Sequence, residues 1–244
     1  MQIIDAQELG YRELNAKVRE IYQSGETQLK LVNVNGHRYI ASGLSGELEL
    51  EIEGTGGNDL AAYMAGPRII VNGNVQDCIA NTMNSGFLAI SGRAGDILGY
   101  GMSGGTIYIR GDVGSRAGIH IKASGTNPPA LIIGGTAGDF LGEYMAGGTI
   151  IVLGLEKEGP VTGRQCGVGM YGGVIYVNKS RFQGDLGPGA QTAAMETEDN
   201  KLIEFYLAGF AEQFGLELAE LQAMEFVKIV PKGERPYKTM YAGV

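Results

Sequence analysis

The sequence predicts an all-β fold: a single-stranded parallel β-helix of about seven coils of about 19 residues, closed by α-helical and hairpin caps. Two repeating patterns and the glycine content predict this fold. One apolar position recurs every nineteen residues and persists after two insertions. It holds Met64, Met83, Met102, Ile121, Met145 and Met170. Glycine accounts for 41 of 244 residues, more than twice the usual share of ~7%. Such a high glycine content is expected for a stacked solenoid with tight turns.

Two aliphatic positions follow the methionine position after five and seven residues. The first holds Leu50, Ile69, Leu88, Ile107, Leu131, Ile150 and Ile175, and the second holds Ile52, Val71, Ile90, Ile109, Ile133, Val152 and Val177. Residues two apart on a strand point to the same side, and stacked strands lie about 4.8 Å apart. Both positions therefore predict continuous apolar ladders. The methionine position is predicted to line the same core, with Ser45 taking that place in the first unit.

Three further positions precede each methionine position. The position four residues before it is apolar or small, and the next holds only small residues. These small residues are Ser42, Ala61, Ala80, Gly99, Gly118, Gly142 and Gly167. Such a size limit predicts a corner where backbones crowd or φ becomes positive. The position six residues before is polar: Asn58, Asp77, Asp96, Ser115, Asp139 and Arg164. We expect these side chains to cap turns through hydrogen bonds to the backbone.

Residues 1–38 are predicted to form an N-terminal cap, and residues 39–179 the β-helix. A helix is expected over Asp5–Gln23, with Asp5 and Glu8 as a capping box. Strands at Gln28–Val34 and His37–Ala41 flank Asn35-Gly36, which predicts a hairpin.

The first strand of the β-helix, Glu47–Gly54, alternates between apolar and acidic residues. The alternation places Leu48, Leu50 and Ile52 inside and four glutamates outside. A metal or acid–base site would need further ligands on neighbouring coils, and none recurs there. We therefore interpret the glutamates as a solvated outer face.

Residues 180–244 are predicted to form a C-terminal cap. It comprises a loop over 184–194, helices near Asn200–Phe214 and Glu217–Met224, a strand at Glu225–Val230 and an extended tail over 232–244. The insertions at Lys122–Pro129 and Leu155–Pro160 and this tail are expected to project from the solenoid as contact points for a partner.

The formal net charge of −8 and the absence of basic runs argue against nucleic acid or an anionic membrane as a partner. The N-terminal residues lack the pattern of a signal peptide, so a cytoplasmic location is expected. Cys78 and Cys166 fall four coils apart, roughly 19 Å, which exceeds the about 7 Å that a disulfide allows. Cys166 is interpreted as a small core residue.

Gly99, Gly101 and Gly104 match the G-x-G-x-x-G fingerprint of dinucleotide sites. That fingerprint works between a strand and a helix, whereas a predicted strand follows here, so we interpret the match as part of the repeat. Motifs of P-loops, zinc proteases and serine hydrolases are absent from the sequence. His37 and His120 have no visible partner, and a structural role is expected for both.

The pattern G-D-x-x-G-x-x-M-x-G-G-x-I-x-V-x-G occurs at Gly95–Gly111 and Gly138–Gly154 and resembles the C-terminal G-x-G-x-G domain of the glutamate synthase large subunit. Gly138–Val177 is the most similar stretch, and the ending at Phe226–Lys232 is similar as well. The resemblance covers the chain from about Tyr39 onward. It extends to one of the subunits of formylmethanofuran dehydrogenase and to one of N-methylglutamate synthase, and it implies a right-handed β-helix.

In the large glutamate synthases this domain carries no catalytic residue and holds the glutamine amidotransferase and the FMN/iron–sulfur synthase domains in place for ammonia channelling. The resemblance therefore implies a non-catalytic scaffold subunit of a split glutamate synthase-like complex, without activity when assayed alone. It implies no catalytic, cofactor-binding or metal-binding residue in this chain, with FMN and iron–sulfur clusters on partner subunits.

Two other functions stay open at this point. The same scaffold could serve a formylmethanofuran dehydrogenase or N-methylglutamate synthase-type complex. An independent β-helix carbohydrate-active enzyme is the third, although the sequence lacks the concentrated Asp, Arg and Lys face expected of one.

Apolar residues also occupy outward positions of several predicted strands, namely Ile70, Tyr108, Ile132, Ile151 and Tyr176. Extended exposed apolar surface usually marks an interface. We expect an FMN-containing glutamate synthase-like subunit to bind this face and a glutamine amidotransferase subunit to bind another.

Overall fold

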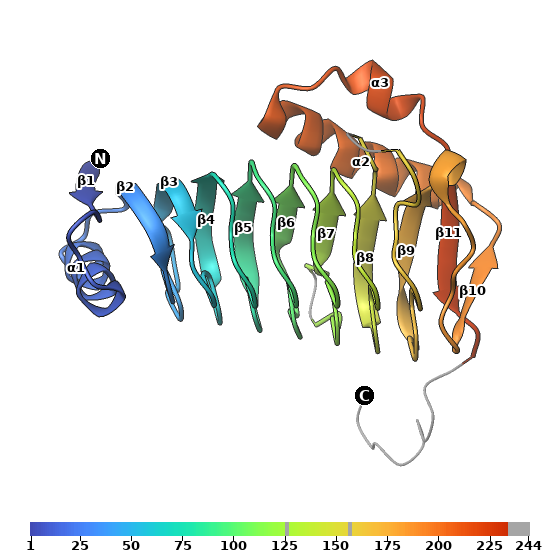
Figure 1. The fold of residues 1–244 in the computed structure, drawn as a ribbon, viewed down its shortest axis with the longest axis horizontal. Coiled ribbons are helices and arrows are strands. Elements are labelled where there is room, and N and C mark those ends of the chain that lie inside the picture. The colour runs from blue at the N-terminus through green and yellow to red at the C-terminus, as the bar shows by residue number, and fades with distance from the viewer. Residues whose placement is uncertain (125–126, 156–157, 234–244) are drawn as a thin grey trace, which may run out of the picture.

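A computed structural model describes residues 1–124, 127–155 and 158–233 of the chain. Its strands form one sheet of eleven strands in the order β1-β2-β3-β4-β5-β6-β7-β8-β9-β11-β10. Strands β2 to β9 follow one another along the long axis of the molecule (Figure 1). All pairs from β1 to β9 are parallel, which confirms the predicted all-β parallel β-helix.

The strands that repeat along the β-helix begin after a cap of one strand and one helix. The first elements are β1 (Gln2–Asp5), α1 (Tyr11–Gln23), β2 (Gln28–His37), β3 (Glu49–Gly56), β4 (Ala65–Asn72) and β5 (Ser85–Ile90). The next are β6 (Thr106–Ile109), β7 (Ala130–Ile133), β8 (Ala146–Val152), β9 (Gly172–Asn178) and a 3-10 turn at Lys179–Arg181. The C-terminal cap consists of β10 (Ala190–Ala193), α2 (Thr197–Phe214), α3 (Leu218–Gln222) and β11 (Phe226–Pro231).

The two predicted aliphatic ladders form the core. Leu50 pairs in register with Ile69, and the same register continues through every repeat strand to Ile175. All members of both ladders are buried. The register also adds Leu29 at one end and Ile229 at the other, since β2 and β11 pair with β3 and β9. Burying each such side chain contributes about 1.5–3 kcal/mol, so the stacked core holds the coils together.

The six residues that end at the methionine position form a second wall of each coil, which we call the turn face. It comprises residues 39–44, 59–64, 78–83, 97–102, 116–121, 140–145 and 165–170. The coils are joined here by backbone hydrogen bonds that alternate in direction. The amides of Asp59 and Tyr63 donate to the next coil, whereas the amide of Ala61 donates to the previous one. The methionines point inward and are buried, which confirms their predicted place in the core.

The small-residue position of the turn face is a left-handed corner, as predicted. Ala61 has a φ of 59° and Gly142 a φ of 66°. A Cβ added at Gly142 would lie 2.6 Å from Cδ1 of Ile175 in the next coil, so space is limited as well. Positive φ alone does not select small residues here, since Ile97 and Phe140 on the same face also have φ values of 62° and 63°. The lack of space therefore explains why glycine and alanine fill this position.

The first coil corrects the predicted alignment by one residue. Leu44 is buried where Ser45 was expected in the methionine position, and Ser45 is exposed. The corner likewise falls on Ala41, with a φ of 58°, instead of Ser42. An additional residue between Leu44 and β3 keeps both ladders in register despite this shift.

The N-terminal cap differs from the prediction in two ways. Helix α1 begins at Tyr11 after Gly10 without a side-chain cap, and Asp5 belongs to strand β1. The hairpin prediction at Asn35-Gly36 is wrong, because β2 continues through both residues parallel to β3. Gly36 adopts a φ of 72°, and the register shifts between Asn35 and His37. The left-handed glycine therefore makes a bulge and no chain reversal.

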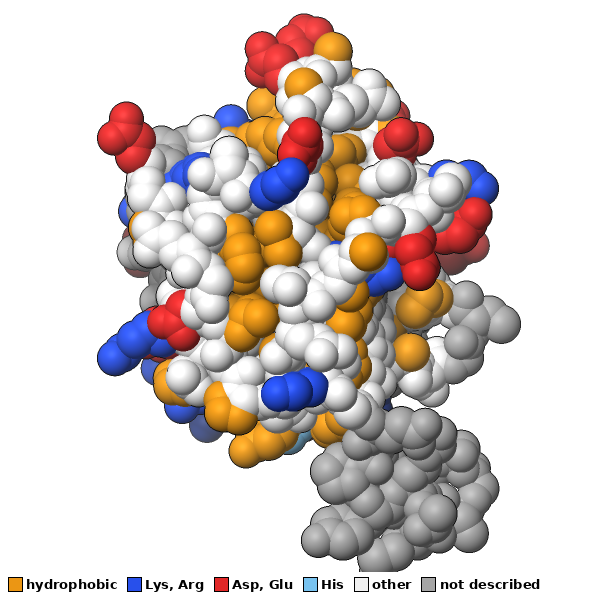
Figure 2. Space-filling model, turned by 90° about the vertical axis from the view of Figure 1, so that its right-hand side faces the viewer, with side chains coloured by type: hydrophobic (Ala, Val, Ile, Leu, Met, Phe, Trp, Pro, Cys, Tyr) orange, Lys and Arg blue, Asp and Glu red, His pale blue; other side chains and the backbone are white. Residues whose placement is uncertain are grey.

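The C-terminal cap closes the other end of the sheet. β11 pairs antiparallel with β9, and β10 pairs antiparallel with β11. Partly buried apolar residues, among them Phe182, Leu186, Ala190 and Val227, pack against the end of the core. Seen from this end, apolar side chains gather over the middle of the surface with charged side chains mostly around them (Figure 2).

Helix α2 lies along the outer face of the sheet near its C-terminal end (Figure 1). Its buried residues, including Ile203, Leu207 and Phe210, form a second core with the outward residues of β6 to β9. Ile132 is 0% exposed as a result. The prediction of an exposed apolar face is therefore wrong for Tyr108, Ile132, Ile151 and Tyr176, which this chain covers itself. Ile70 is half-buried and packs at the margin of this second core.

Candidate interaction surface

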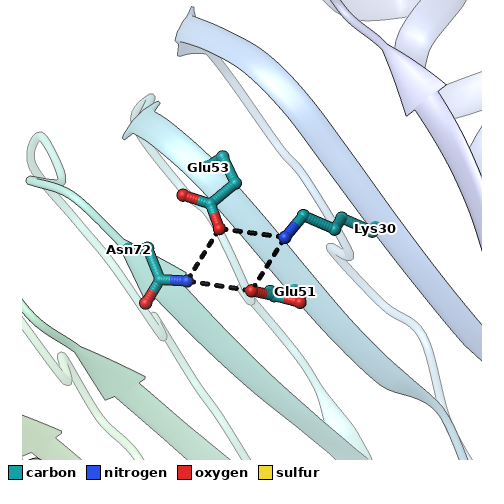
Figure 3. Close-up of polar contacts among 4 residues, drawn as sticks. All are labelled: Lys30, Glu51, Glu53 and Asn72. Carbon is teal, nitrogen blue, oxygen red and sulfur yellow. Dashed lines mark hydrogen bonds and ion pairs between the residues drawn. The ribbon is translucent and has the colours of Figure 1, made fainter.

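The outer face of β2 to β4 carries a polar cluster at the end of the sheet that α2 leaves uncovered. Lys30 Nζ lies 3.1 Å from carboxylate oxygens of both Glu51 and Glu53, and the Asn72 amide donates to the same two oxygens at 3.0 Å (Figure 3). The hydrogen bonds from Asn72 and then Lys30 hold the pKa of Glu53 below its ordinary value. The outward glutamates thus form the predicted solvated face.

The same outward position changes character along the sheet. In register it holds Lys30 and Glu51 on β2 and β3, then Ile70 on β4, Ala89 on β5 and Tyr108 on β6. Helix α2 packs over the apolar part of this row, and the charged part faces solvent. The side chains of the strands therefore determine how far the helix covers the sheet.

Arg68 lines three adjoining hollows on this part of the sheet. They have volumes of about 330, 400 and 410 Å³ and extend from Gln28 and Glu49 to Glu212 at the end of α2. The Arg68 guanidinium lies 4.1 Å from the ring centre of Phe87 and donates to Gln213 Oε1. This arrangement holds the last turn of α2 to the sheet.

A buried ionic cluster anchors the beginning of α2. Tyr176 Oη donates to Asp199 Oδ1 at 2.5 Å, and Lys228 Nζ lies 2.7 Å from Asp199 Oδ2. Burial opposes ionisation of Asp199, but the hydrogen bonds from Lys228, Tyr176 and the Glu196 amide outweigh it and lower its pKa. The cluster joins β9, α2 and β11, and the sequence offered no periodic signal for it.

The polar position six residues before the methionine position connects neighbouring coils. Asp77 Oδ1 accepts from the amide of Asp96 at 2.8 Å, and Asp96 Oδ1 accepts from the amide of Ser115 at 2.7 Å. Asn58 accepts from the amide of Asp77 in the same way, at 3.3 Å. The predicted side-chain hydrogen bonds to backbone are thus confirmed, although each amide lies one coil further on.

The two cysteines are free, as predicted. Burial raises the pKa of Cys166 to about 12, consistent with its interpretation as a core residue. Burial, followed by the nearby carboxylates of Asp59, Asp77 and Asp96, raises the pKa of Cys78. Both effects disfavour the reactive thiolate form.

The glycines of the G-x-G-x-x-G match are part of the repeat. Gly99 and Gly101 have φ values of 69° and 59° on the turn face, and strand β6 follows them. A Cβ at Gly104 would lie 2.4 Å from the carbonyl oxygen of Asn84 in the previous coil. Close packing of coils therefore accounts for these glycines. Among the described residues, no group of three or more His, Cys, Asp and Glu side chains could hold a metal ion.

The histidines have different surroundings. His37 Nδ1 accepts from the amide of Asn35, and its Nε2 donates to the Leu9 carbonyl at 2.9 Å. His37 thereby ties the segment before α1 to β2, a structural role as expected. His120 is exposed on the turn face. Its ring centre lies 5.3 Å from that of Tyr144, with the two rings stacked, and 5.7 Å from that of Tyr100, with the two rings nearly perpendicular.

The turn face concentrates exposed aromatic residues. Tyr63, Tyr100 and Tyr144 are 57%, 40% and 45% exposed, and Tyr39 is exposed at the N-terminal end of the same face. Ile97, Ile119, Phe140 and Val168 on this face are half-buried. Since α2 covers the apolar part of the sheet, the turn face is the candidate interaction surface.

The predicted contact loops are partly described. Arg181 donates from Nε to the carbonyl of Gly159 at 2.8 Å and from Nη1 to the carbonyl of Gly154, so it holds both ends of the second insertion. Residues 125 and 126 of the first insertion, 156 and 157 of the second, and 234–244 of the predicted tail lie outside the described residues. Within the described part, no helix has both the length and the apolar character needed to cross a membrane.

A family model described as the GXGXG motif matches residues 10–232. A protein of Methanocaldococcus jannaschii, described as uncharacterized, is 42% identical over 249 residues, covering 98% of this chain and 95% of that protein.

Proposed function

Because this chain belongs to the GXGXG motif family, we propose that it is a non-catalytic scaffold subunit of a split glutamate synthase-like complex. The family match over residues 10–232 carries the proposal, since the resembling domain of the large glutamate synthases holds catalytic domains in place. In the proposed complex this chain binds an FMN-containing synthase-like subunit and a glutamine amidotransferase subunit. FMN and iron–sulfur clusters belong to the partner subunits.

The physical properties of the fold support a scaffold. Every coil is fixed by strand pairing on the sheet and by alternating backbone hydrogen bonds on the turn face. The interior is filled by aliphatic ladders and methionines. A rigid body presents its surface groups in constant positions, so little conformational entropy is lost when a partner binds.

Co-expression tests the proposal. The chain with an affinity tag is co-expressed with the FMN-containing and amidotransferase subunits from its own genome, and the eluate is separated by size exclusion. We expect one complex that contains all three proteins and shows a flavin spectrum.

Elution of the chain alone under these conditions would refute the scaffold function. Recovery of the chain with subunits of a formylmethanofuran dehydrogenase or an N-methylglutamate synthase from native cells would instead assign the same scaffold to that complex.

A further inference from the structure

We propose that the turn face binds a basic segment of a partner protein, whose Arg or Lys side chains lie over the exposed tyrosines and pair with Asp59, Asp77 and Asp96. The inference rests on the proposed scaffold function and specifies the surface and the chemistry of one partner. Three features of the turn face support it: a row of aromatic side chains, an adjoining group of carboxylates and a rigid backbone.

The aromatic row consists of Tyr63, Tyr100, His120 and Tyr144 and is exposed, whereas the inward ladders and the outward residues beneath α2 are buried. Tyr63 and Tyr144 occupy the same position of the repeat as His120, and Tyr100 lies against His120 from the neighbouring coil. Tyrosine is enriched at protein interfaces because it buries a large area at low entropic cost. Aromatic rings also bind cations through their faces, so this row fits Arg or Lys side chains of a partner.

The carboxylates lie beside the first part of the row. Hydrogen bonds join the three residues: the Asp59 amide donates to the Asp77 carbonyl at 3.2 Å, and Asp77 Oδ1 accepts from the Asp96 amide at 2.8 Å. Asp77 and Asp96 are exposed, and each uses Oδ1 for the amide of the next coil. Among the described residues none of the three forms an ion pair, in contrast to Asp139, which pairs with Arg164 at 2.9 Å. The region therefore carries uncompensated negative charge.

Charge complementarity favours a basic partner over a second copy of this chain. Toward the other end, Arg116 on the turn face and Arg164 just before it are already paired with Glu143 and Asp139. The chain as a whole has a net charge of −8, so two copies repel each other. A partner that brings its own Arg or Lys gains both ion pairs and contacts with the tyrosine rings.

The backbone of the turn face is preorganised for binding. Tyr63, Thr82 and Tyr144 donate their amides to the next coil at 2.7, 2.7 and 2.9 Å. The positions of the rings and carboxylates are thus set before a partner arrives. Preorganisation of this kind reduces the entropic cost of association.

Two double variants test the surface. Tyr100→Ala with Tyr144→Ala removes the aromatic contact. Asp77→Asn with Asp96→Asn removes charge while keeping an oxygen that accepts the inter-coil hydrogen bond, as Asn58 does at the same position. The matched controls are Phe205→Ala on the outer side of α2 and Glu49→Gln on the sheet.

Affinity is measured with the purified FMN-containing subunit and the purified amidotransferase subunit, each at about 0.01 M and about 0.15 M salt. For one of the two subunits we expect each double variant to weaken binding at least about tenfold. The aspartate variant should also lose most of the salt dependence, whereas both controls bind like the wild type. Circular dichroism should be unchanged for all four proteins.

The other outcomes separate the two proposals. If the wild type and both double variants bind equally, the turn-face proposal is overturned while the scaffold function stands. If the wild type binds neither subunit, the scaffold function is overturned and the turn-face proposal with it. If the isolated wild type is a dimer in sedimentation and the tyrosine variant is a monomer, the occupant is a second copy and the basic-partner proposal is wrong.

Discussion

The side of a strand on which a residue lies determines its role in this protein. Tyr108, on the outer side of β6, packs on Phe210 of α2 at 5.5 Å, and burial raises its pKa to about 12. Its neighbours Ile107 and Ile109 point inward and are 0% exposed. Tyr100, seven residues before Ile107, is exposed on the turn face. The role of a residue therefore depends on its place in the coil as well as on its type.

Ile109→Asp is expected to prevent folding, because a carboxylate in the stacked core lacks any partner and costs several kcal/mol. Ile109→Val at the same site removes one methylene and should cost only about 0.5–1.5 kcal/mol. The measurement is expression in the soluble fraction followed by urea unfolding. Wild-type stability of Ile109→Asp would show that the ladder does not face the core.

The Asp199 cluster predicts a pH dependence of stability. The pKa of Asp199 is lowered in the folded protein, so its contribution is present above the ordinary carboxyl pKa of ~3.9 and is lost as the pH falls through the folded value. Asp199→Asn leaves Lys228 without its nearest charge partner and should cost about 3 kcal/mol at neutral pH.

Urea unfolding between about pH 7 and about pH 3 checks this prediction. The free energy of unfolding should fall less steeply with acid in Asp199→Asn than in the wild type. Other carboxylates with lowered pKa values, such as Glu53 and Asp139, contribute equally to both proteins and cancel in the comparison. Parallel curves for the two proteins would contradict the assigned role of Asp199.

At the scale of elements, helix α2 buries the outward apolar side chains of the sheet that it covers. It begins at Thr197 after a capping box between Glu196 and Asp199 and ends at Phe214, where Gly215 caps it in left-handed conformation. Its apolar side faces the outward ladder of β6 to β9, and Asp199 anchors its first turn. Without the helix, that ladder would expose Tyr108, Ile132, Ile151 and Tyr176.

Two phenylalanines of α2 give a matched test of this packing. Phe210 is 0% exposed, whereas Phe205 is 70% exposed. Phe210→Ala should cost about 3–5 kcal/mol, and Phe205→Ala should change stability by at most about 0.5 kcal/mol. Hydrogen exchange of the α2 amides and urea unfolding measure both. Equal effects of the two substitutions would mean that α2 does not rest on the sheet through Phe210.

At the scale of the whole molecule, the repeat was predictable because each ladder residue contacts its own equivalents in the neighbouring coils. Ile69 lies between Leu50 and Leu88 in the register, so the spacing of like residues reports real contacts. Elements outside the repeat gave no such signal. The bulge at Gly36 looked like a hairpin turn, because both use a left-handed glycine.

The candidate surface was harder to predict than the core. The outward residues Ile132 and Ile151 are apolar, and nothing in their spacing shows that α2, more than forty residues later, returns to cover them. Tyr63, Tyr100 and Tyr144 share no single repeat position, since Tyr100 is displaced by one residue. In the structure the His120 ring lies between Tyr100 and Tyr144 and contacts both, although the three residues are far apart in sequence.

The isolated chain is expected to be colourless and to lack glutaminase and glutamate synthase activity, because the proposed function assigns both reactions to partner subunits. The test is an absorption spectrum, metal analysis and both assays on the purified protein, with the reconstituted complex as the positive control. A stoichiometric flavin spectrum of the isolated chain would overturn the interpretation of its glycines as corners.

The fixed length of α2 has a consequence for how this protein can change in evolution. A helix of 18 residues spans about 27 Å, which corresponds to between five and six stacked coils of about 4.8 Å. Duplicating a coil beneath α2 would separate Asp199 at one end from the Arg68–Gln213 contact at the other. Duplicating a coil before β4 disturbs neither anchor. Gain or loss of whole coils among descendants of this chain is therefore expected in the part that carries Lys30, Glu51 and Glu53, where the solenoid can grow without a matching change in the helix.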